Sequence, residues 1–254
     1  MFFFRKNHLK EMKYISDQKG IINRYLREFD EWQSHLENCK KFILNSAESK
    51  NKNSIAVLGS GWLLDFPIEE INLIFKKIYL IDIVHPKQIQ NKVKKMKSVE
   101  LITMDITGNA VKNVFNFLKK TKKNYKKNFF NEIELENLNF LKDIDFVVSL
   151  NILNQLDILI IDYLKKLNFP YEKEILEIRK KIQKHHLENL PKNKSCLITD
   201  FEELIFDSKN KLEKTNKLVF IDFKNIKKTW KWDFDKFNYY KNKKVIFNVL
   251  AAEI

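Results

Sequence analysis

The chain has 254 residues, of which 44% are hydrophobic and 31% charged, with only four glycines and four prolines. This length and composition predict one large globular domain with an appendage, and they exclude a fibrous or intrinsically disordered chain. Cys39 and Cys196 form no CxxC pair, so neither a disulfide framework nor a zinc site is expected. Since no apolar run approaches the ~20 residues of a membrane span, we expect a cytoplasmic protein without a membrane partner.

The net charge of +14 is the compositional feature that suggests a nucleic-acid partner, because clustered cations neutralise phosphates. Only four of the 47 Lys and Arg residues are Arg, however, and bidentate recognition of phosphates or bases favours arginine. We therefore favour a solvated, lysine-rich surface. An RNA-associated protein, using the lysine-rich run 119–127, is kept as an alternative.

Residues 1–53 are expected to form an N-terminal helical extension. Between 21 and 45 the apolar residues recur at spacings of three and four, which predicts one amphipathic helix. Because this apolar stripe has to be covered, we expect the helix to pack against the following domain, beside its ligand crevice, or against a partner chain. The stripe consists of Ile22, Leu26, Phe29, Trp32, Leu36, Cys39 and Ile43.

Residues 54–254 alternate between short apolar runs and helical patterns, which is typical of a parallel sheet covered by helices. Helices are expected to begin near Pro67 and Asn109 and to cover 152–167 and 172–190. The fold class predicted is α/β: a Rossmann-like, doubly wound, mostly parallel sheet with a C-terminal antiparallel hairpin, preceded by the helical extension. Strands are expected at 54–59, 77–82, 99–105, 143–150, 195–200, 217–223, 229–234 and 243–252.

The strongest local feature is the turn Gly59-Ser60-Gly61, which follows the first predicted strand directly. Glycines permit positive φ and let a ligand approach the backbone closely, and the N–H groups of a following helix can bind an anionic group. Two spaced glycines alone are equally consistent with a tight connection between strand and helix.

Polar residues follow the ends of the later strands. Asp82, which lies about 20 residues beyond Gly61, is placed to accept hydrogen bonds from both hydroxyls of a ribose. Asp105 could accept from the exocyclic amine of an adenine, and Ser149 and Asn151 follow the fourth strand. The carboxyl ends of parallel strands meet at one crevice, so these side chains are expected to converge there. The alternative for either acid is to cap a helix or to solvate a loop.

Between Ser54 and Ile254 this arrangement resembles the class I S-adenosylmethionine-dependent methyltransferases. The resemblance implies that the two glycines lie beneath the methionine part of the cofactor, that Asp82 holds the ribose, and that Asp105 with Ile106 faces the adenine. Asn151 and Asn154 would face the substrate. The implied cofactor-binding set is Gly59, Ser60, Gly61, Asp82, Ile83, Asp105, Ile106 and Ser149.

Two positions depart from the pattern of that family. Its glycine turn usually carries a third glycine at the position of Leu63, and often an acid at the position of Val57. Asp65 is a candidate to replace that acid near the ammonium group of the cofactor, or to serve as a helix N-cap.

The function expected from these features is S-adenosylmethionine-dependent methyl transfer to an unidentified acceptor. The alternatives are a methyltransferase-like binding protein without catalysis and the RNA-associated protein described above. No catalytic residue and no metal ligand are assigned. His85 is a candidate base, although a surface histidine is the favoured interpretation. Trp230 and Trp232 alternate with polar residues and are expected to pack their indoles on one face of the sheet.

Overall fold

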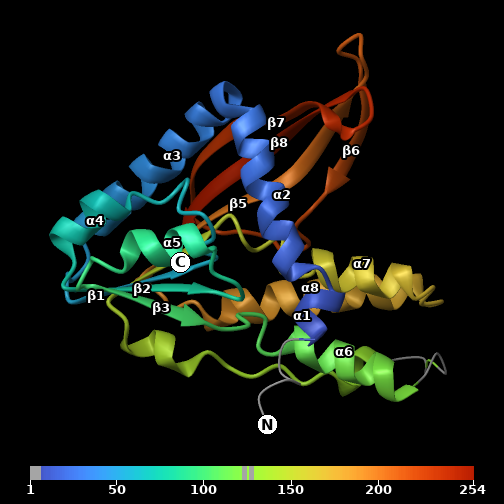
Figure 1. Ribbon diagram of the computed structural model, residues 1–254, viewed down its shortest axis with the longest axis horizontal. Coiled ribbons are helices and arrows are strands. Elements are labelled where there is room, and N and C mark those ends of the chain that lie inside the picture. The colour runs from blue at the N-terminus through green and yellow to red at the C-terminus, as the bar shows by residue number, and fades with distance from the viewer. Residues whose placement is uncertain (1–6, 122–124, 126–128) are drawn as a thin grey trace.

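The structure is a computed structural model that describes residues 7–121, 125 and 129–254. Most of the predicted lysine-rich excursion at 119–127 therefore lies outside the described residues. In the described part of the chain, eight strands form a single sheet, in which the strand order is β3-β2-β1-β4-β5-β8-β7 and β6 pairs with β5 (Figure 1). The strands are β1 (Ser54–Leu58), β2 (Lys77–Asp82), β3 (Val99–Thr103), β4 (Phe146–Leu150), β5 (Ser195–Phe206), β6 (Leu212–Lys217), β7 (Ile226–Tyr240) and β8 (Lys243–Glu253).

The first five strands run parallel, and the last strands run antiparallel to their neighbours. β8 lies between β5 and β7, so the long hairpin of β7 and β8 closes the sheet at that edge. This confirms the predicted Rossmann-like α/β fold with a mostly parallel sheet and a C-terminal antiparallel hairpin. The reversal of strand order between β1 and β4 marks the point where such sheets bind ligands.

The apolar runs form strands because both faces of the sheet are buried. Along β1, Ile55 and Val57 pack on one face, and Ala56 and Leu58 pack on the other. Each buried aliphatic side chain contributes about 1.5–3 kcal/mol relative to exposure. The parallel register is therefore fixed on two sides, since a slip of one residue would exchange the faces.

Helices cover both faces of the sheet. The core on one face contains side chains of α3 (Phe29–Glu48), α4 (Ile68–Ile74) and α5 (Lys87–Val93). The core on the other face contains side chains of α6 (Ala110–Thr121), α7 (Ile158–Lys166) and α8 (Glu172–Asn189). Two short 3-10 helices, η1 (Phe129–Glu132) and η2 (Asn139–Asp143), precede β4.

The predicted single helix over 21–45 is wrong, because the structure has two helices there. α2 (Tyr14–Arg27) ends at Arg27, α3 begins at Phe29 after the single residue Glu28, and a short α1 (Asn7–Glu11) precedes them. Leu26 and Phe29 are 66% and 47% exposed, so the expected stripe is interrupted where the chain turns. The turn is held by Arg27, whose guanidinium pairs with both Glu28 and Asp235 of β7.

The predicted strand at 217–223 is also wrong, because β6 ends at Lys217. Beyond it, Leu218 and Val219 both donate to the main-chain oxygen of Phe201, and Phe220 donates to the side-chain oxygen of Gln183 on α8. These bonds replace a strand ladder. The predicted helix at 152–167 begins later, at Ile158, so residues 151–157 form a loop beyond β4.

Within the described residues, none of the helices combines the length and the hydropathy that crossing a membrane requires.

Candidate cofactor and acceptor site

The glycine turn after β1 has a backbone that only glycine adopts easily. Gly59 has a φ of 81°, and a Cβ atom at this position would lie 2.7 Å from Cβ of Ile152. Gly61 has a φ of 43°. Leu63, at the position of the missing third glycine, also has a positive φ, of 55°. The turn therefore keeps a glycine-like path there, at a cost of about 1–2 kcal/mol for a residue with a Cβ.

Asp82 at the end of β2 is held against this turn. Its Oδ2 accepts the backbone N–H of Gly61 at 2.8 Å, and its Oδ1 accepts the N–H of Val84 at 3.3 Å. The side chain is buried, and burial raises the pKa of its carboxyl group, while the bonds from Gly61 and Val84 act in the opposite direction. Each oxygen retains a lone pair for a ligand hydroxyl.

A cavity of about 270 Å³ opens at this edge of the sheet, between the turn, the loop after β4 and the helices α2 and α3. It brings together seven of the ten predicted cofactor and substrate residues. These seven are Gly59, Ser60, Gly61, Asp82, Ile83, Asn151 and Asn154.

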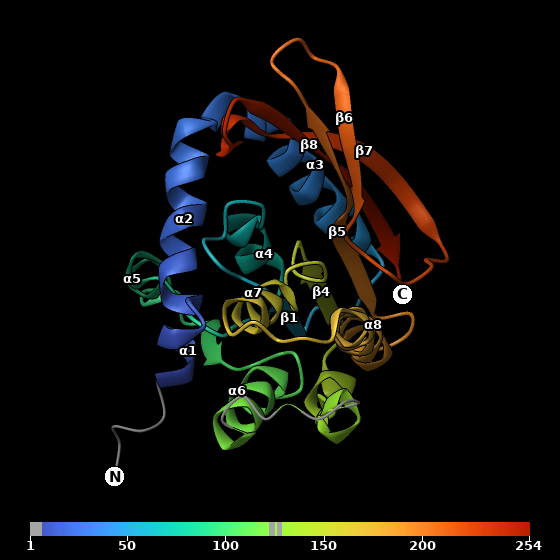
Figure 2. The ribbon, with the colours of Figure 1, turned by 90° about the vertical axis from the view of Figure 1, so that its right-hand side faces the viewer.

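The N-terminal helices form the wall of the cavity opposite the sheet. Figure 2 shows α2 rising from α1 at its lower end towards the part of the sheet that β7 and β8 form at the top. Tyr14, Asp17 and Gln18 of α2 line the cavity, and the indole N–H of Trp62 donates to the main-chain oxygen of Gln18 at 2.7 Å. The extension therefore encloses the predicted crevice, and the position of a helix beside it agrees with the sequence-based expectation.

Asp105, Ile106 and Ser149 lie elsewhere. Both carboxylate oxygens of Asp105 are bonded locally: Oδ1 accepts from the N–H and the hydroxyl of Thr107, and Oδ2 accepts from the N–H of Val111 in the first turn of α6. Ile106 is buried in the core beneath α6, and Ser149 contacts Nε2 of His186 at 2.8 Å. None of the three lines a cavity described here, and their contact with a cofactor stays a prediction.

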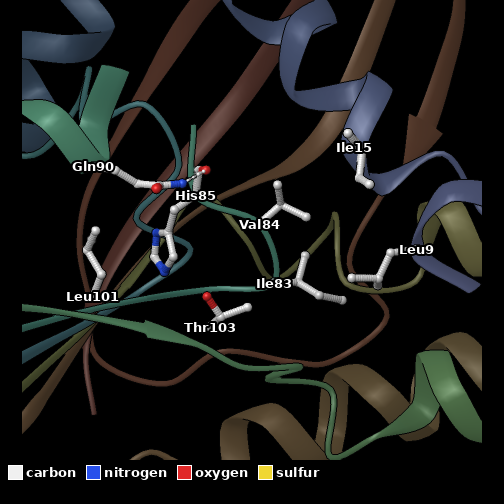
Figure 3. Close-up of a pocket in the computed structure, with 8 residues that line it drawn as sticks. All are labelled: Leu9, Ile15, Ile83, Val84, His85, Gln90, Leu101 and Thr103. Atoms are coloured by element: carbon white, nitrogen blue, oxygen red, sulfur yellow. Dashed lines mark hydrogen bonds between the residues drawn. The ribbon is translucent and has the colours of Figure 1, made fainter. Parts of the chain in front are cut away.

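A second cavity, of about 380 Å³, adjoins the first and shares Ile83 with it. Figure 3 shows Leu9 and Ile15 of the N-terminal helices facing Ile83 and Thr103 across it. His85 lines this cavity and is only 8% exposed, so the favoured interpretation as a surface histidine is wrong. Its Nε2 lies 3.1 Å from the main-chain oxygen of Ile102, an acceptor, which places the ring proton on Nε2. The residues around His85 carry no sequence signal of this burial, which comes from the contact with β3.

His35, Cys39 and Asp65 converge beside the first cavity, with possible ligand atoms within 4.8 Å of one another. The amide Nδ2 of Asn151 sits among them, 2.6 Å from Oδ2 of Asp65 and 3.2 Å from Nε2 of His35. Sequence reasoning proposed Asp65 as a cofactor contact or an N-cap. The structure excludes the cap, because the N-cap of α4 is Pro67. Burial raises the pKa of the Asp65 carboxyl group.

The donor set of this cluster does not suit a metal ion. The indole N–H of Trp230 lies 3.1 Å from Nδ1 of His35 and is placed to donate to it. A neutral imidazole that bound a metal at Nε2 would carry its proton on Nδ1, where it would face the indole N–H of Trp230. Burial lowers the pKa of His35 to about 3, and the ring of Trp232 stacks on it at 3.9 Å. Both indoles thus lie on one face of the sheet, as the sequence predicted, and they contact the imidazole of His35 on α3.

Asp200 and Asn154 form the polar wall at the other side of the first cavity. Asn154 Nδ2 donates to Oδ2 of Asp200 at 2.8 Å. Asp200 is 1% exposed, and burial raises the pKa of its carboxyl group to about 7. Sequence analysis saw Asp200 only as the end of a strand. The signal that could have found it is that Asp82 and Asp200 both follow an apolar run of a parallel strand.

No family model and no curated protein matches the chain. Among solved structures, it is similar to the N-methyltransferase NodS from Bradyrhizobium japonicum WM9, with 9% identity over 86% of this chain and 96% of that chain and a TM-score of 0.39. The complex of NodS with S-adenosyl-L-homocysteine gives 10% identity over 85% and 86% of the two chains and a TM-score of 0.38. The methyltransferase domain of bacterial CtHen1-CN gives 10% identity over 84% and 98% and a TM-score of 0.33. The fold assignment rests on the strand order and directions described above.

Proposed function

We propose that this protein is an S-adenosylmethionine-dependent methyltransferase whose acceptor binds in the cavity between the glycine turn and the helices α2 and α3. The observation that carries the proposal is the bond from the Gly61 N–H to Asp82 at the wall of that cavity. It places a buried carboxylate against bare backbone at the switch point of a parallel sheet, where nucleoside ligands bind in this fold class.

The residues of the site suit the parts of this cofactor. A side chain at Gly59 would collide with Ile152. Only bare backbone therefore fits where the cofactor would come closest to the turn. Asp82 would accept the ribose hydroxyls, and Ser60 Oγ, buried without a hydrogen-bond partner among the described residues, faces the same region. The apolar second cavity beyond Ile83 offers a surface for the flat adenine base.

When bound, the cofactor supplies a methyl group on a sulfonium, which a lone pair of the acceptor takes while the carbon–sulfur pair stays on sulfur. The protein has to position the acceptor and exclude water. The contacts of α2 and α3 with the rim serve both tasks: Trp62 bonds to Gln18, and the indole of Trp32 donates to the main-chain oxygen of Phe234 at 2.9 Å. These bonds tie α2 to the glycine turn and α3 to β7 beside the cavity.

Calorimetric titration with S-adenosyl-L-homocysteine tests the proposal. The wild-type chain is expected to bind this product, and Asp82→Ala is expected to weaken binding at least tenfold, because a hydrogen bond to a charged group is worth about 1.5–3 kcal/mol. The exposed Asp222 provides the matched control, since Asp222→Ala removes a carboxylate outside the cavity. Absence of binding by the folded wild-type chain, or equal affinity of the two variants, would overturn the proposal.

A further inference from the structure

The side chain of Asp200 is aimed by an irregularity of the sheet. In the ladder between β5 and β8, Asp200 pairs with Val249 and Glu202 with Asn248, so Phe201 is an extra residue in β5. Such bulges redirect a side chain and are frequent beside active sites. Asp200 is the last residue before the bulge, and it lines the cavity together with Asn154.

Acceptor atoms without partners gather in this wall. Oδ1 of Asp200 and Oδ1 of Asn154 are buried and have no hydrogen-bond partner among the residues that the structure describes. The amide orientation of Asn154 is fixed, because its Nδ2 faces the Asp200 carboxylate and its Oδ1 must point away from it. While Asp200 is ionised, these two oxygen atoms can accept hydrogen bonds but cannot donate them. They therefore call for a ligand that donates N–H or O–H groups.

The charges that line the cavity favour a cation over a neutral donor. Its acidic residues are Asp17, Asp65, Asp82 and Asp200, and its one Arg or Lys residue is Arg24. The guanidinium of Arg24 forms an ion pair with Asp235, with its Nε 3.4 Å from Oδ2, although this nitrogen makes no hydrogen bond among the described residues. With Asp82 committed to the cofactor, Asp200 is the most deeply buried carboxylate left for the acceptor.

The aromatic wall of the same cavity also suits a cation. Trp32, Trp232, Phe234 and Tyr239 line the cavity. The guanidinium carbon of Arg24 lies 4.6 Å from the ring centroid of Phe234 and 4.8 Å from that of Tyr239, so this wall already holds one cation through its rings. A ligand with an ammonium group next to an apolar or aromatic body matches both parts of the wall.

From these contacts we infer that the methyl acceptor is an amine, whose N–H groups are bound by Oδ1 of Asp200 and Oδ1 of Asn154, and that Asp200 takes its proton. This inference rests on the proposed methyltransferase function. The acceptor enters as an ammonium ion, and one N–H bond breaks with its electron pair left on nitrogen. The proton moves to Oδ1 of Asp200, and the neutral amine is the nucleophile. The buried carboxylate is suited to this transfer because its raised pKa brings it closer to that of an amine.

Binding of phenethylamine and of 2-phenylethanol, measured by calorimetry at pH 8 on protein saturated with S-adenosyl-L-homocysteine, tests the inference. The two probes share a carbon skeleton and differ in the donor group. We expect the amine to bind at least tenfold more tightly than the alcohol. Asp200→Asn is expected to bring the two affinities within about twofold of each other, and Asn154→Leu to weaken the amine at least fivefold. Asp222→Asn, on the exposed surface, is the matched control and should keep the preference.

The outcomes separate this inference from the proposed function. If S-adenosyl-L-homocysteine binds but the wild-type chain does not prefer the amine, the acceptor assignment is overturned and the methyltransferase proposal stands. If the product does not bind at all, the methyltransferase proposal fails, and the probes are then compared on the protein alone. A preference that survives in a folded Asp200→Asn variant would also overturn the role of Asp200. If Asp200→Asn does not fold, the inference is tested by the preference of the wild-type chain for the amine and by the loss of amine affinity in Asn154→Leu.

Discussion

The indole N–H of Trp62 donates to the main-chain oxygen of Gln18 across 2.7 Å, joining the residue after the glycine turn to the second turn of α2. Both residues line the main cavity. α2 contains no buried residue along its length, so it has little apolar packing to hold it over the sheet. The bond from Trp62 is the contact that ties α2 to the glycine turn, and the ion pairs of Arg24 and Arg27 with Asp235 tie the other end of α2 to β7.

Replacing Trp62 by phenylalanine removes this bond and keeps an aromatic ring. We expect a loss of about 1 kcal/mol in the closure of α2, seen as roughly fivefold faster amide hydrogen exchange in residues 14–27. Exchange–mass spectrometry measures this, and peptides from α8 in the same sample are the internal control. Unchanged exchange in α2 would show that other contacts hold the helix.

Gly59→Ala is expected to destabilise the protein and to abolish binding of S-adenosyl-L-homocysteine. Its Cβ would lie 2.7 Å from Ile152, and its φ of 81° is unfavourable for alanine. Gly20→Ala is the matched control: it lies inside α2, where a Cβ meets nothing within 4 Å, and alanine should stabilise the helix by about 0.5–1 kcal/mol. Thermal melting and calorimetry distinguish the two. A Gly59→Ala variant that binds the product normally would contradict the assignment of the turn.

The positive φ of Leu63 predicts that glycine is more stable than alanine at this position, which reverses the usual order of the two residues. Leu63→Ala and Leu63→Gly both remove a buried side chain, but only alanine retains the cost of a Cβ at a φ of 55°. The glycine variant is therefore expected to be the more stable by about 1 kcal/mol. At Ala56, in the middle of β1, the substitution to glycine should be destabilising by a similar amount. Chemical unfolding measures both, and a less stable Leu63→Gly would refute the left-handed backbone.

Asp200 predicts a pH dependence of stability. Burial raises the pKa of its carboxyl group from 3.8 to about 7, so between these pH values the folded state binds more protons than the unfolded state. The contribution of this group to stability is therefore full below about pH 4 and decreases as the pH rises to 7. Asn cannot ionise, so Asp200→Asn should raise the melting temperature at pH 8 and leave it nearly unchanged at pH 4.

Other titratable groups near Asp200 have to be considered in that comparison. Glu203 on β5 raises the pKa of Asp200. Cys39 on α3 is close enough to be affected by Asp200, but burial raises the pKa of its thiol well above the range tested. Asn154, on the loop after β4, does not titrate. A melting-temperature difference that is the same at both pH values would mean that the ionisation of Asp200 does not change between them, and would contradict a pKa near 7.

The parallel strands and the glycine turn could be predicted from the sequence because their signals are local. Val57 and its neighbours form an apolar run that only a strand buried on both faces explains, and Gly59 ends it. The place of Asp82 could be predicted for the same reason, because it ends the apolar run of β2. Asp105 carried the same signal, yet β3 ends at Thr103 and two further residues turn the carboxylate towards α6, where backbone N–H groups bind it.

The walls of the site could not be predicted because they depend on tertiary contacts. The break at Glu28 follows from the pairing of Arg27 with Asp235, more than 200 residues later in the chain. The orientation of Asp200 follows from a bulge that appears only when β5 pairs with β8. The donor that faces Nδ1 of His35 comes from Trp230 of β7. Each of these relations joins segments whose own sequences carry no sign of the partner.

The crystal structure of the protein grown with S-adenosyl-L-homocysteine would test the central claim most directly. The account predicts a nucleoside at the carboxyl edge of the sheet, with its ribose hydroxyls bonded to Asp82 and its homocysteine part over Gly59 and Gly61. A nucleoside bound away from Asp82, or a glycine turn that contacts no ligand in crystals saturated with it, would contradict the account.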